Sequence, residues 1–367
     1  MGTPSAGRSF LGTVAMVFLA MAALFAADMF LAKTEKAESQ VEAARLFEQG
    51  RGLMHRGENA EAIERIKDAI SIERGNRDYL RTLAQAQFAA GKTADAESTL
   101  TELLQSDSTD SLASLIMGRV LVKEGRFAEA LSYFHRAIYG HWNENAAENR
   151  LRVRFELIDL LAERNSKAEL LAELLPVQDD APRDLRTRTR MGQLFLLAGS
   201  PARAVDVFRG ILHDAPANAE AYAGLGAAEF ARGNYRAAQR DFQTTLRLAP
   251  DDQATRRRLD VCNELLMLDP TMRGLGPAER FSRSLKLVEL TLDEARQCIG
   301  QNPLPELQGL LDKAGTALKA HVSAAHESDV SESNLDLAEQ LWQARKGCKS
   351  PPAMDSPLAL VLTRLAQ

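Results

Sequence analysis

Few residues in this 367-residue chain have the types and spacing that catalysis or metal binding requires. No Cys-x-x-Cys occurs, and the histidines show no spacing that would place two zinc ligands on one helix face. The triplet Gly91-Lys92-Thr93 resembles the end of a phosphate-binding loop, but the first glycine of that motif would fall at Ala86. No serine stands in a nucleophile-elbow pattern. The sequence therefore predicts no catalytic site, no metal and no cofactor.

One alternative keeps a catalytic role open. His321, His326 and Glu327 lie within one short segment, so an enzyme with its site in the C-terminal region is the alternative to a non-catalytic protein. A catalytic site needs titratable groups that converge in a pocket, whereas an adaptor needs only a groove. The sequence contains no such constellation that can be recognised, which favours the non-catalytic interpretation.

The composition points to one fold class and excludes one class of partner. The chain is 45% hydrophobic and 26% charged, as is typical of folded proteins, but only 6% of its residues are aromatic. Alanine, leucine, glutamate, arginine and glutamine are abundant, and these residues favour helices over sheets. We therefore expect an all-α fold. The net charge of -5 gives no basic surface, so nucleic acid is not an expected partner.

The N-terminal segment contains a long apolar run. Phe10–Ala27 carries no charge, and Met29–Leu31 extends the run past Asp28. As a helix the run would be about 33 Å long, enough to cross a hydrocarbon core of about 30 Å. We expect the segment 1–32 to form a single membrane anchor. The alternatives are a cleaved signal peptide, for which Ala20-Met21-Ala22 offers a cleavage pattern, and a buried core helix.

The charges around this run leave its orientation open. Lys33, Lys36 and Arg45 follow the run and only Arg8 precedes it, which by the positive-inside rule would place the rest of the chain in the cytoplasm. A short leading tail before an apolar run is, however, the usual export signal. The cysteines described below also favour export, so we expect the remainder to be extracytoplasmic, and periplasmic in a bacterium.

Five glycines divide the middle of the chain at one constant interval: Gly57, Gly91 and Gly125, then Gly199 and Gly233. A small residue stands seven positions before each glycine, an alanine five positions after it, and a large apolar residue nine positions after it. The separation of Gly125 and Gly199 is two such intervals plus six positions, so one degenerate unit fills it.

This pattern resembles the tetratricopeptide repeat, a helix-turn-helix unit of about 34 residues. The small residues let the two helices of a unit approach closely, the glycine supplies the turn, and the large apolar residue fills the space between pairs. A single pair cannot bury its apolar face, so the units must stack into a superhelical solenoid. In bacteria, membrane-anchored repeat proteins of this layout have assembly and stability roles, which is what the resemblance implies here.

The expected organisation follows from the repeat and the flanking segments. It comprises the anchor at 1–32, three units at 43–142, a degenerate unit and linker at 143–184, two units and a capping helix at 185–268, and a small C-terminal helical bundle at 277–367.

The first helix of each unit would line the concave face of the solenoid, where a protein or peptide client would bind. When equivalent positions are counted in the first helix of each unit, the candidate groove residues are Phe47, Arg51, Met54, Arg81, Gln85, Phe88, Leu115, Arg119 and Gln193. The three arginines come from consecutive units and would form a ladder for an acidic or extended peptide, while Phe47, Phe88 and Leu115 would supply apolar pockets. The alternative is an ordinary solvated face.

Two of the three cysteines, Cys298 and Cys348, close the first and third helices expected in the C-terminal bundle. In an up-down-up arrangement these helices are parallel, which places both cysteines at one end. A disulfide between them would suit an exported protein, although two buried thiols in a cytosolic protein explain the same residues. Cys262, in the capping helix, is expected to be a buried thiol.

Together these features predict a membrane-anchored, non-catalytic scaffold or adaptor that binds a protein or peptide client in its concave groove. Envelope assembly, transport or quality control are the processes expected for it. A cytoplasm-facing adaptor at the membrane is the alternative.

Overall fold

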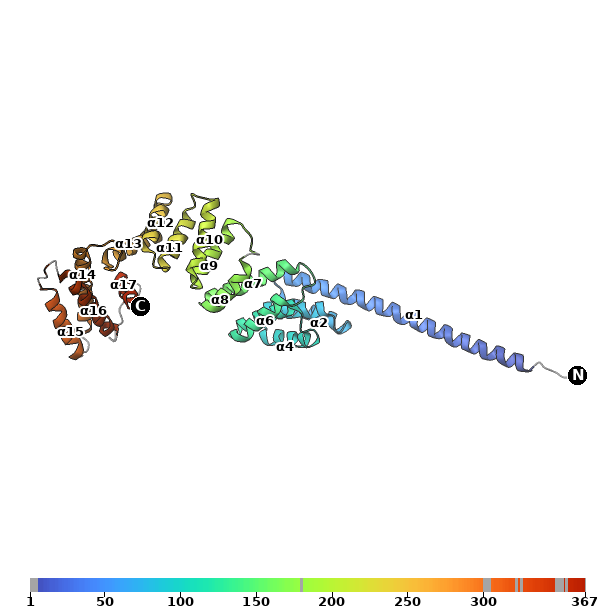
Figure 1. Ribbon diagram of the computed structural model, residues 1–367. Helices are drawn as coiled ribbons and strands as arrows, with labels where there is room; N and C mark the ends of the chain where they lie inside the picture. Colours follow the sequence, from blue (N-terminus) through green and yellow to red (C-terminus); the bar gives the residue numbers. More distant parts are fainter. Residues whose placement is uncertain are drawn as a thin grey trace. The chain divides into compact units, whose positions relative to one another are not determined.

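The computed structural model describes residues 6–178, 181–299, 305–320, 323, 326–346, 353 and 356–366. Within these residues the chain forms seventeen α-helices (Figure 1) and one isolated parallel β-bridge. The expected all-α class is therefore confirmed. The chain divides into two compact units, one up to Leu160 and one from Leu161, and the boundary falls within α7.

The first unit contains three regular helix pairs and most of a seventh helix. Its helices are α1 (Ala6–His55), α2 (Asn59–Ile72), α3 (Arg77–Ala89), α4 (Thr93–Ser106), α5 (Ser111–Lys123), α6 (Phe127–Tyr139) and α7 (Ala146–Glu163).

The second unit continues the pairs and then changes architecture after α13. Its helices are α8 (Lys167–Val177), α9 (Leu185–Leu197), α10 (Pro201–Asp214), α11 (Ala219–Ala231), α12 (Tyr235–Leu248), α13 (Gln253–Leu268), α14 (Pro277–Ile299), α15 (Pro305–Ala317), α16 (Glu327–Lys346) and α17 (Pro357–Leu365).

The turn inside each helix pair requires a left-handed backbone. The five repeat glycines all have φ between 72° and 80°, a conformation that glycine adopts without steric cost. In the degenerate unit Asn165 takes this place with a φ of 54°, and it stands one repeat interval before Gly199. Asparagine is one of the few other residues that tolerate this conformation. The degenerate unit therefore keeps the turn of the repeat without its glycine.

A capped N-terminus at the first helix of a pair also recurs at the repeat interval. The side chains of Asn76 and Asp110, and in the second unit those of Asp184, Asn218 and Asp252, accept hydrogen bonds from backbone N–H groups of the helix that follows. Each such cap stabilises a helix by about 1 kcal/mol. The caps therefore set where the first helices begin, as the left-handed turns set where the second helices begin.

The helices of a pair approach closely where a glycine faces a ring. A Cβ atom on Gly226 would lie 2.6 Å from the Phe242 ring of the same unit. Phe208 of α10 is enclosed from two sides, because Gly192 of its own helix pair and Gly224 on α11 of the next pair both face its ring. Phe208 and Phe242 are fully buried. The expected close approach of paired helices at small residues is thus confirmed at these positions.

Each unit curves towards its first helices. Consecutive first helices contact one another, α1 with α3, α3 with α5, and α9 with α11. In the part of the chain that the structure describes, the second helices of neighbouring pairs show no comparable contact. Elements that lie closer together are on the inside of a bend, so the first helices form the concave face.

After α13 the chain forms a helical bundle whose core is continuous with Leu265 of α13. Asn334 donates to Ser284 at 3.0 Å, and Arg345 lies 3.3 Å from Glu294 further along the same two helices. Since the residue numbers rise together, α14 and α16 are parallel, as expected. The last helix, α17, instead packs on the capping helix α13, where Leu358, Val361 and Leu362 join the core that contains Leu265.

Two expectations concern residues that lie wholly or largely outside the described set. Among the described residues, no helix has the length and apolar character that crossing a membrane requires. Most side chains of Phe10–Ala27, within α1, lie outside the described residues, so the anchor stays a prediction. The same holds for the Cys298–Cys348 disulfide, because neither side chain is described. Cys262 is a buried free thiol, as expected.

A partly buried carboxylate in α12 makes the second unit sensitive to pH. Burial raises the pKa of Asp241 to about 6, and the charge of Glu229 acts in the same direction, whereas Arg240 and Arg209 oppose both. Glu229 is itself buried and accepts hydrogen bonds from Arg209 and Asn234. The folded state thus holds a proton on Asp241 at pH values where the unfolded chain, with a pKa of about 3.9, has lost it.

Asp241→Asn should therefore stabilise the protein in a pH-dependent manner. Stability conferred by the Asp241 proton is lost as the pH rises from about 4 through about 6, so the gain in the variant should be small at pH 4.5. At pH 7.5 it should reach about 1–2 kcal/mol once solvent screening is allowed for. Urea unfolding at both pH values measures it. Asp260→Asn, at an exposed position in α13, is the control, and an equal gain at both pH values would contradict the assignment.

Candidate functional site

The apolar residues predicted for the groove lie mostly within helix contacts. The Phe47 ring stacks on Tyr79 with centroids 4.4 Å apart, and Met54 packs against the core formed by α2 and α3. Phe88 is partly buried, and the Lys123 ammonium lies 5.4 Å from its ring centroid. In contrast to the prediction, Leu115 does not supply an apolar pocket of the groove, because only 1% of its surface is exposed. Helix α5 is buried on nearly all sides, so this position belongs to the core and not to an accessible pocket.

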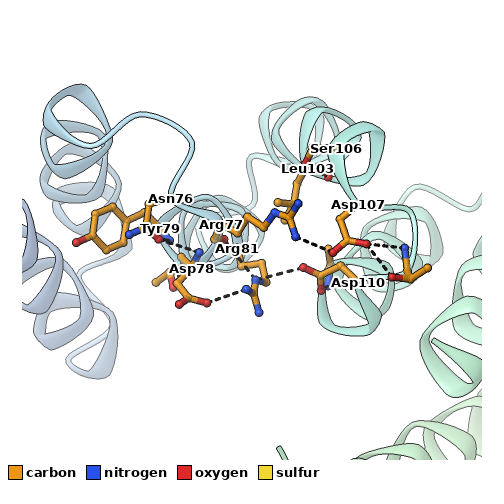
Figure 2. A network of polar contacts seen from close by, with 12 residues as sticks. Asn76, Arg77, Asp78, Tyr79, Arg81, Leu103, Ser106, Asp107 and Asp110 are labelled. Atoms are coloured by element: carbon orange, nitrogen blue, oxygen red, sulfur yellow. Dashed lines mark hydrogen bonds and ion pairs between the residues drawn. The ribbon is translucent and has the colours of Figure 1, made fainter. Parts of the chain in front are cut away.

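Arg81 is held between two carboxylates. Its guanidinium lies 2.8 Å from Asp78 on its own helix and 3.3 Å from Asp110, the capping residue of α5. The Arg81 side chain is only 15% exposed and Asp110 is buried, so this pair ties α3 to the start of α5 (Figure 2). Removing one partner of such a buried pair is costly, because the other charge is then left uncompensated.

A second ion pair lies beside this one in Figure 2. Arg77 lies 2.8 Å from Asp107, in the loop before α5. Hydrogen bonds from Thr109 hold the pKa of Asp107 below its ordinary value, and Arg77 acts in the same direction. The loop between α4 and α5 is therefore fastened to the first turn of α3 by charge.

The other two predicted ladder arginines also have carboxylate partners. Arg119 makes two hydrogen bonds of 2.7 Å to Glu156 on α7, which raise the pKa of Arg119. Arg51 pairs with Glu48 on its own helix at 2.8 Å, where both side chains are exposed. An acidic ligand at Arg81 or Arg119 would compete with Asp110 or Glu156, whereas the pair of Arg51 is confined to the surface of its own helix. The contact of the three arginines with a ligand stays a prediction.

The two predicted glutamines lie in different units. Gln85 is partly buried on α3. Gln193 is exposed on α9 of the second unit and donates to Glu220 of α11 at 3.3 Å. Each stands on a first helix, as expected, but the two belong to different compact units.

A hollow beside some of the predicted groove residues lies in the first unit. It is a cleft of about 750 Å³ between the starts of α3, α5 and α7. Side chains of both charges line it: Arg77, Arg81 and Arg152, with Asp78, Asp107, Asp110 and Glu144. Asn76, Leu112, Asn149 and the loop from His141 to Asn143 complete its wall. Such a mixture of donors and acceptors suits a ligand that carries both, such as a peptide chain.

An inserted loop shapes one side of this cleft. Backbone hydrogen bonds join Ser111 to His141 and His141 to Thr109, which form the isolated bridge beside Asp110. Trp142 is buried below the loop, where its indole donates to the carbonyl of Ala137 at 2.8 Å. This loop has six residues, where the loops before α3 and α5 have four, and α7 has 18 residues, where α3 and α5 have 13. The positions in excess of two repeat intervals are therefore shared between the loop and α7.

Groups for catalysis do not gather in the described part of the chain. No set of three or more His, Cys, Asp or Glu residues among the described positions could hold a metal ion. Of the alternative enzymatic set, His326 lies 2.9 Å from the Ser323 hydroxyl, Glu327 begins α16, and His321 is outside the described residues.

The family comparison agrees with the helix pairs and turns described above. The model described as "Tetratricopeptide repeat" matches residues 53–120 and 195–259. The chain contains tetratricopeptide repeats. The predicted resemblance is therefore confirmed, and the two matched ranges fall in the first and second units respectively.

Individual relatives are distant. DnaJ homolog subfamily C member 3 of Rattus norvegicus is 24% identical over 265 residues, covering 68% of this chain and 50% of the relative, so the chain spans about half that protein's length. The structure of YrrB, described as a TPR protein with an unusual peptide-binding site, is 18% identical and covers 53% of this chain and 97% of its own, with a TM-score of 0.40. The yeast Sti1 TPR2AB–pHSP90 complex is 17% identical, covers 83% and 99%, and has a TM-score of 0.30.

The cleft also contains residues that the sequence analysis did not predict. His141 and Trp142 lie in the loop between α6 and α7, and Asn149 and Arg152 lie near the start of α7, the first helix of the degenerate unit. The six extra positions were a visible signal of an insertion, and loops inserted between repeats often lie on a binding face. A second signal was the recurring Asn or Asp before each first helix, because Asp110 both caps α5 and lines the cleft.

Proposed function

We propose that this protein is a non-catalytic scaffold whose first unit binds an extended segment of a client protein. The observation that carries this proposal is the cleft of about 750 Å³ at the starts of α3, α5 and α7, which opens beside the concave face of the tetratricopeptide units. Its acidic, basic and amide side chains would bond to the backbone and polar side chains of the client, and Leu112 would contact apolar ones.

The internal ion pairs support this role by making the cleft rigid before a client arrives. Arg81 and Arg77 are already oriented by Asp110 and Asp107, so little side-chain freedom is lost when a peptide binds beside them. The exposed Arg152 and Glu144 are less constrained and would supply the contacts that select the client.

A peptide array tests the proposal. The full-length protein would be screened against random twelve-residue peptides, and the best ligand measured in solution by fluorescence anisotropy. The paired swap Glu144→Lys with Arg152→Glu keeps the net charge and should weaken binding by at least about tenfold, since charge-assisted hydrogen bonds are worth about 1.5–3 kcal/mol. The swap Glu64→Lys with Lys67→Glu, at an exposed ion pair on α2, is the control and should change affinity less than about twofold. Equal affinity of both swaps would refute the cleft as the binding site.

We also propose that the segment 1–32 anchors the chain in a membrane and that the repeats face the extracytoplasmic side, in a bacterium the periplasm. The uncharged run Phe10–Ala27 supports the anchor, and the placement of the cysteines supports export. A scaffold in that position would hold clients in envelope assembly, transport or quality control.

The parallel register of α14 and α16 supports a disulfide between Cys298 and Cys348. Glu294 and Arg345 are in contact, and the two cysteines follow them along the chain by four and three positions. A disulfide there would close a loop of about 50 residues and is expected to stabilise the protein by about 2–4 kcal/mol.

Thiol labelling in intact cells checks export and the disulfide together. A membrane-impermeant maleimide should label Cys298 and Cys348 only after reduction. Cys262 should stay unlabelled in the folded protein, because burial raises the pKa of its thiol to about 11 and a thiolate is the reactive form. If Cys298 and Cys348 instead label without reduction and only after lysis, both proposals fail.

A further inference from the structure

A second hollow, in the second unit, differs from the cleft in its charge. It has a volume of about 560 Å³ and lies where the first turn of α12, the loop that follows α13 and the final helix α17 meet. Four arginines line it, Arg236, Arg240, Arg273 and Arg364, and its lining includes no aspartate or glutamate. We call it the arginine pocket.

Two of these arginines are held in place by neighbouring groups. Arg364 forms an ion pair with the buried Asp269, donates to the Thr271 hydroxyl at 2.7 Å, and lies 5.8 Å from the centroid of the Tyr235 ring. Arg236 donates to the backbone carbonyl of Arg273 at 3.3 Å. These contacts draw α17 and the loop after α13 against the start of α12, and they orient both guanidinium groups before any ligand binds.

The other two arginines are exposed, Arg240 on α12 and Arg273 in the loop after α13. With Arg364 balanced by Asp269, the pocket still presents several positive charges around one small volume. Like charges that line one small pocket repel one another and favour the binding of an anion between them. The first turn of α12 adds the positive end of its helix dipole to the same wall.

We propose that the arginine pocket binds a multiply charged phosphate group. Guanidinium groups recognise phosphate with pairs of parallel hydrogen bonds, and several of them around one site favour a ligand with more than one negative charge. A single carboxylate would leave most of this charge uncompensated. The pocket lies in the second unit and shares no lining residue with the client cleft, so this proposal does not rest on the function proposed above.

Pyrophosphate is a suitable probe because it is small, multiply charged and offers no other recognition feature. Calorimetric titration of the full-length protein at constant ionic strength should show saturable binding, and the Tm should rise with pyrophosphate concentration. The double variant Arg240→Ala and Arg273→Ala should weaken binding by at least about tenfold, since each removes a charge-assisted hydrogen bond. Both residues are exposed, so the Tm without ligand should change little.

The control is Arg257→Ala with Arg258→Ala, which removes the same charge from exposed positions on α13 outside the pocket. It should change the affinity by less than about twofold, because distant surface charges are screened by salt. Equal losses in both double variants, or no saturable binding by the unaltered protein, would overturn the proposal. Citrate binding as tight as pyrophosphate would overturn the assignment to phosphate, whereas inorganic phosphate binding more weakly than pyrophosphate would support the need for multiple charge.

Discussion

Replacing Phe208 by alanine should lower the free energy of unfolding by about 3–5 kcal/mol, the range for removing a fully buried aromatic ring. The ring is completely buried, and on two sides its neighbours are Gly192 and Gly224. Glycines have no side chains that could move into the vacated space, so the cavity would stay open. Urea unfolding followed by circular dichroism in the far ultraviolet measures the loss.

Leu248→Ala is the control for this prediction, because it also truncates an apolar side chain but at a position of α12 that is 44% exposed. It should cost less than about 1 kcal/mol, since little apolar surface is removed from burial there. If Phe208→Ala were no more destabilising than Leu248→Ala, the enclosure of Phe208 between two tetratricopeptide units would not contribute to stability as we infer.

Adding a single methyl group at Gly224 should also destabilise the protein, by about 1–3 kcal/mol. The new Cβ atom would lie 2.3 Å from the nearest atom of the Phe208 ring, far inside van der Waals contact. In an open helix the same change would instead stabilise by up to about 1 kcal/mol, because alanine has the higher helix propensity. A loss of stability would therefore indicate that α10 and α11 are in close contact at Gly224, whereas a gain would indicate that they are not. Thermal and urea unfolding of Gly224→Ala measure it.

Gly309→Ala in α15 is the matched control, since nothing lies within 4 Å of the Cβ atom it would add. It should be neutral or stabilising. The double variant Gly224→Ala with Phe208→Leu should lose less stability than the two single changes added together, because the smaller side chain makes room for the methyl group. Strict additivity would show that Gly224 and Phe208 do not compete for the same space.

Much of the repeat architecture could be predicted because it depends on short-range relations along the chain. The constant repeat interval places a turn glycine, a small residue and an aromatic ring at set distances, and each acts on a helix only a few positions away. The degenerate unit departs from this pattern in its longer first helix and in its turn residue: Asn165 provides the same left-handed turn as glycine.

The candidate site was less predictable. The repeat interval indicates which face of a helix a residue lies on, but not which side chains from other helices pack against that face. Arg81 and Arg119 do lie on first helices, but their partners Asp110 and Glu156 come from other parts of the chain, at the start of α5 and on α7. Leu115 was predicted to line the groove and is instead buried. Its helix is apolar on nearly every side, which the regular spacing of groove positions does not reveal.

By itself the sequence determined the all-α class, the repeat period and the places where helices start and turn, since caps, glycines and close-packed small residues act over one or two turns of helix. Only the tertiary structure decided which charges meet. Helix α17 returns to α13 and carries Arg364 to Asp269 and the arginine pocket, although the two residues lie far apart along the chain. Such a contact depends on the packing of apolar side chains such as Leu265 and Val361, and that packing is non-directional and leaves no local pattern in the sequence.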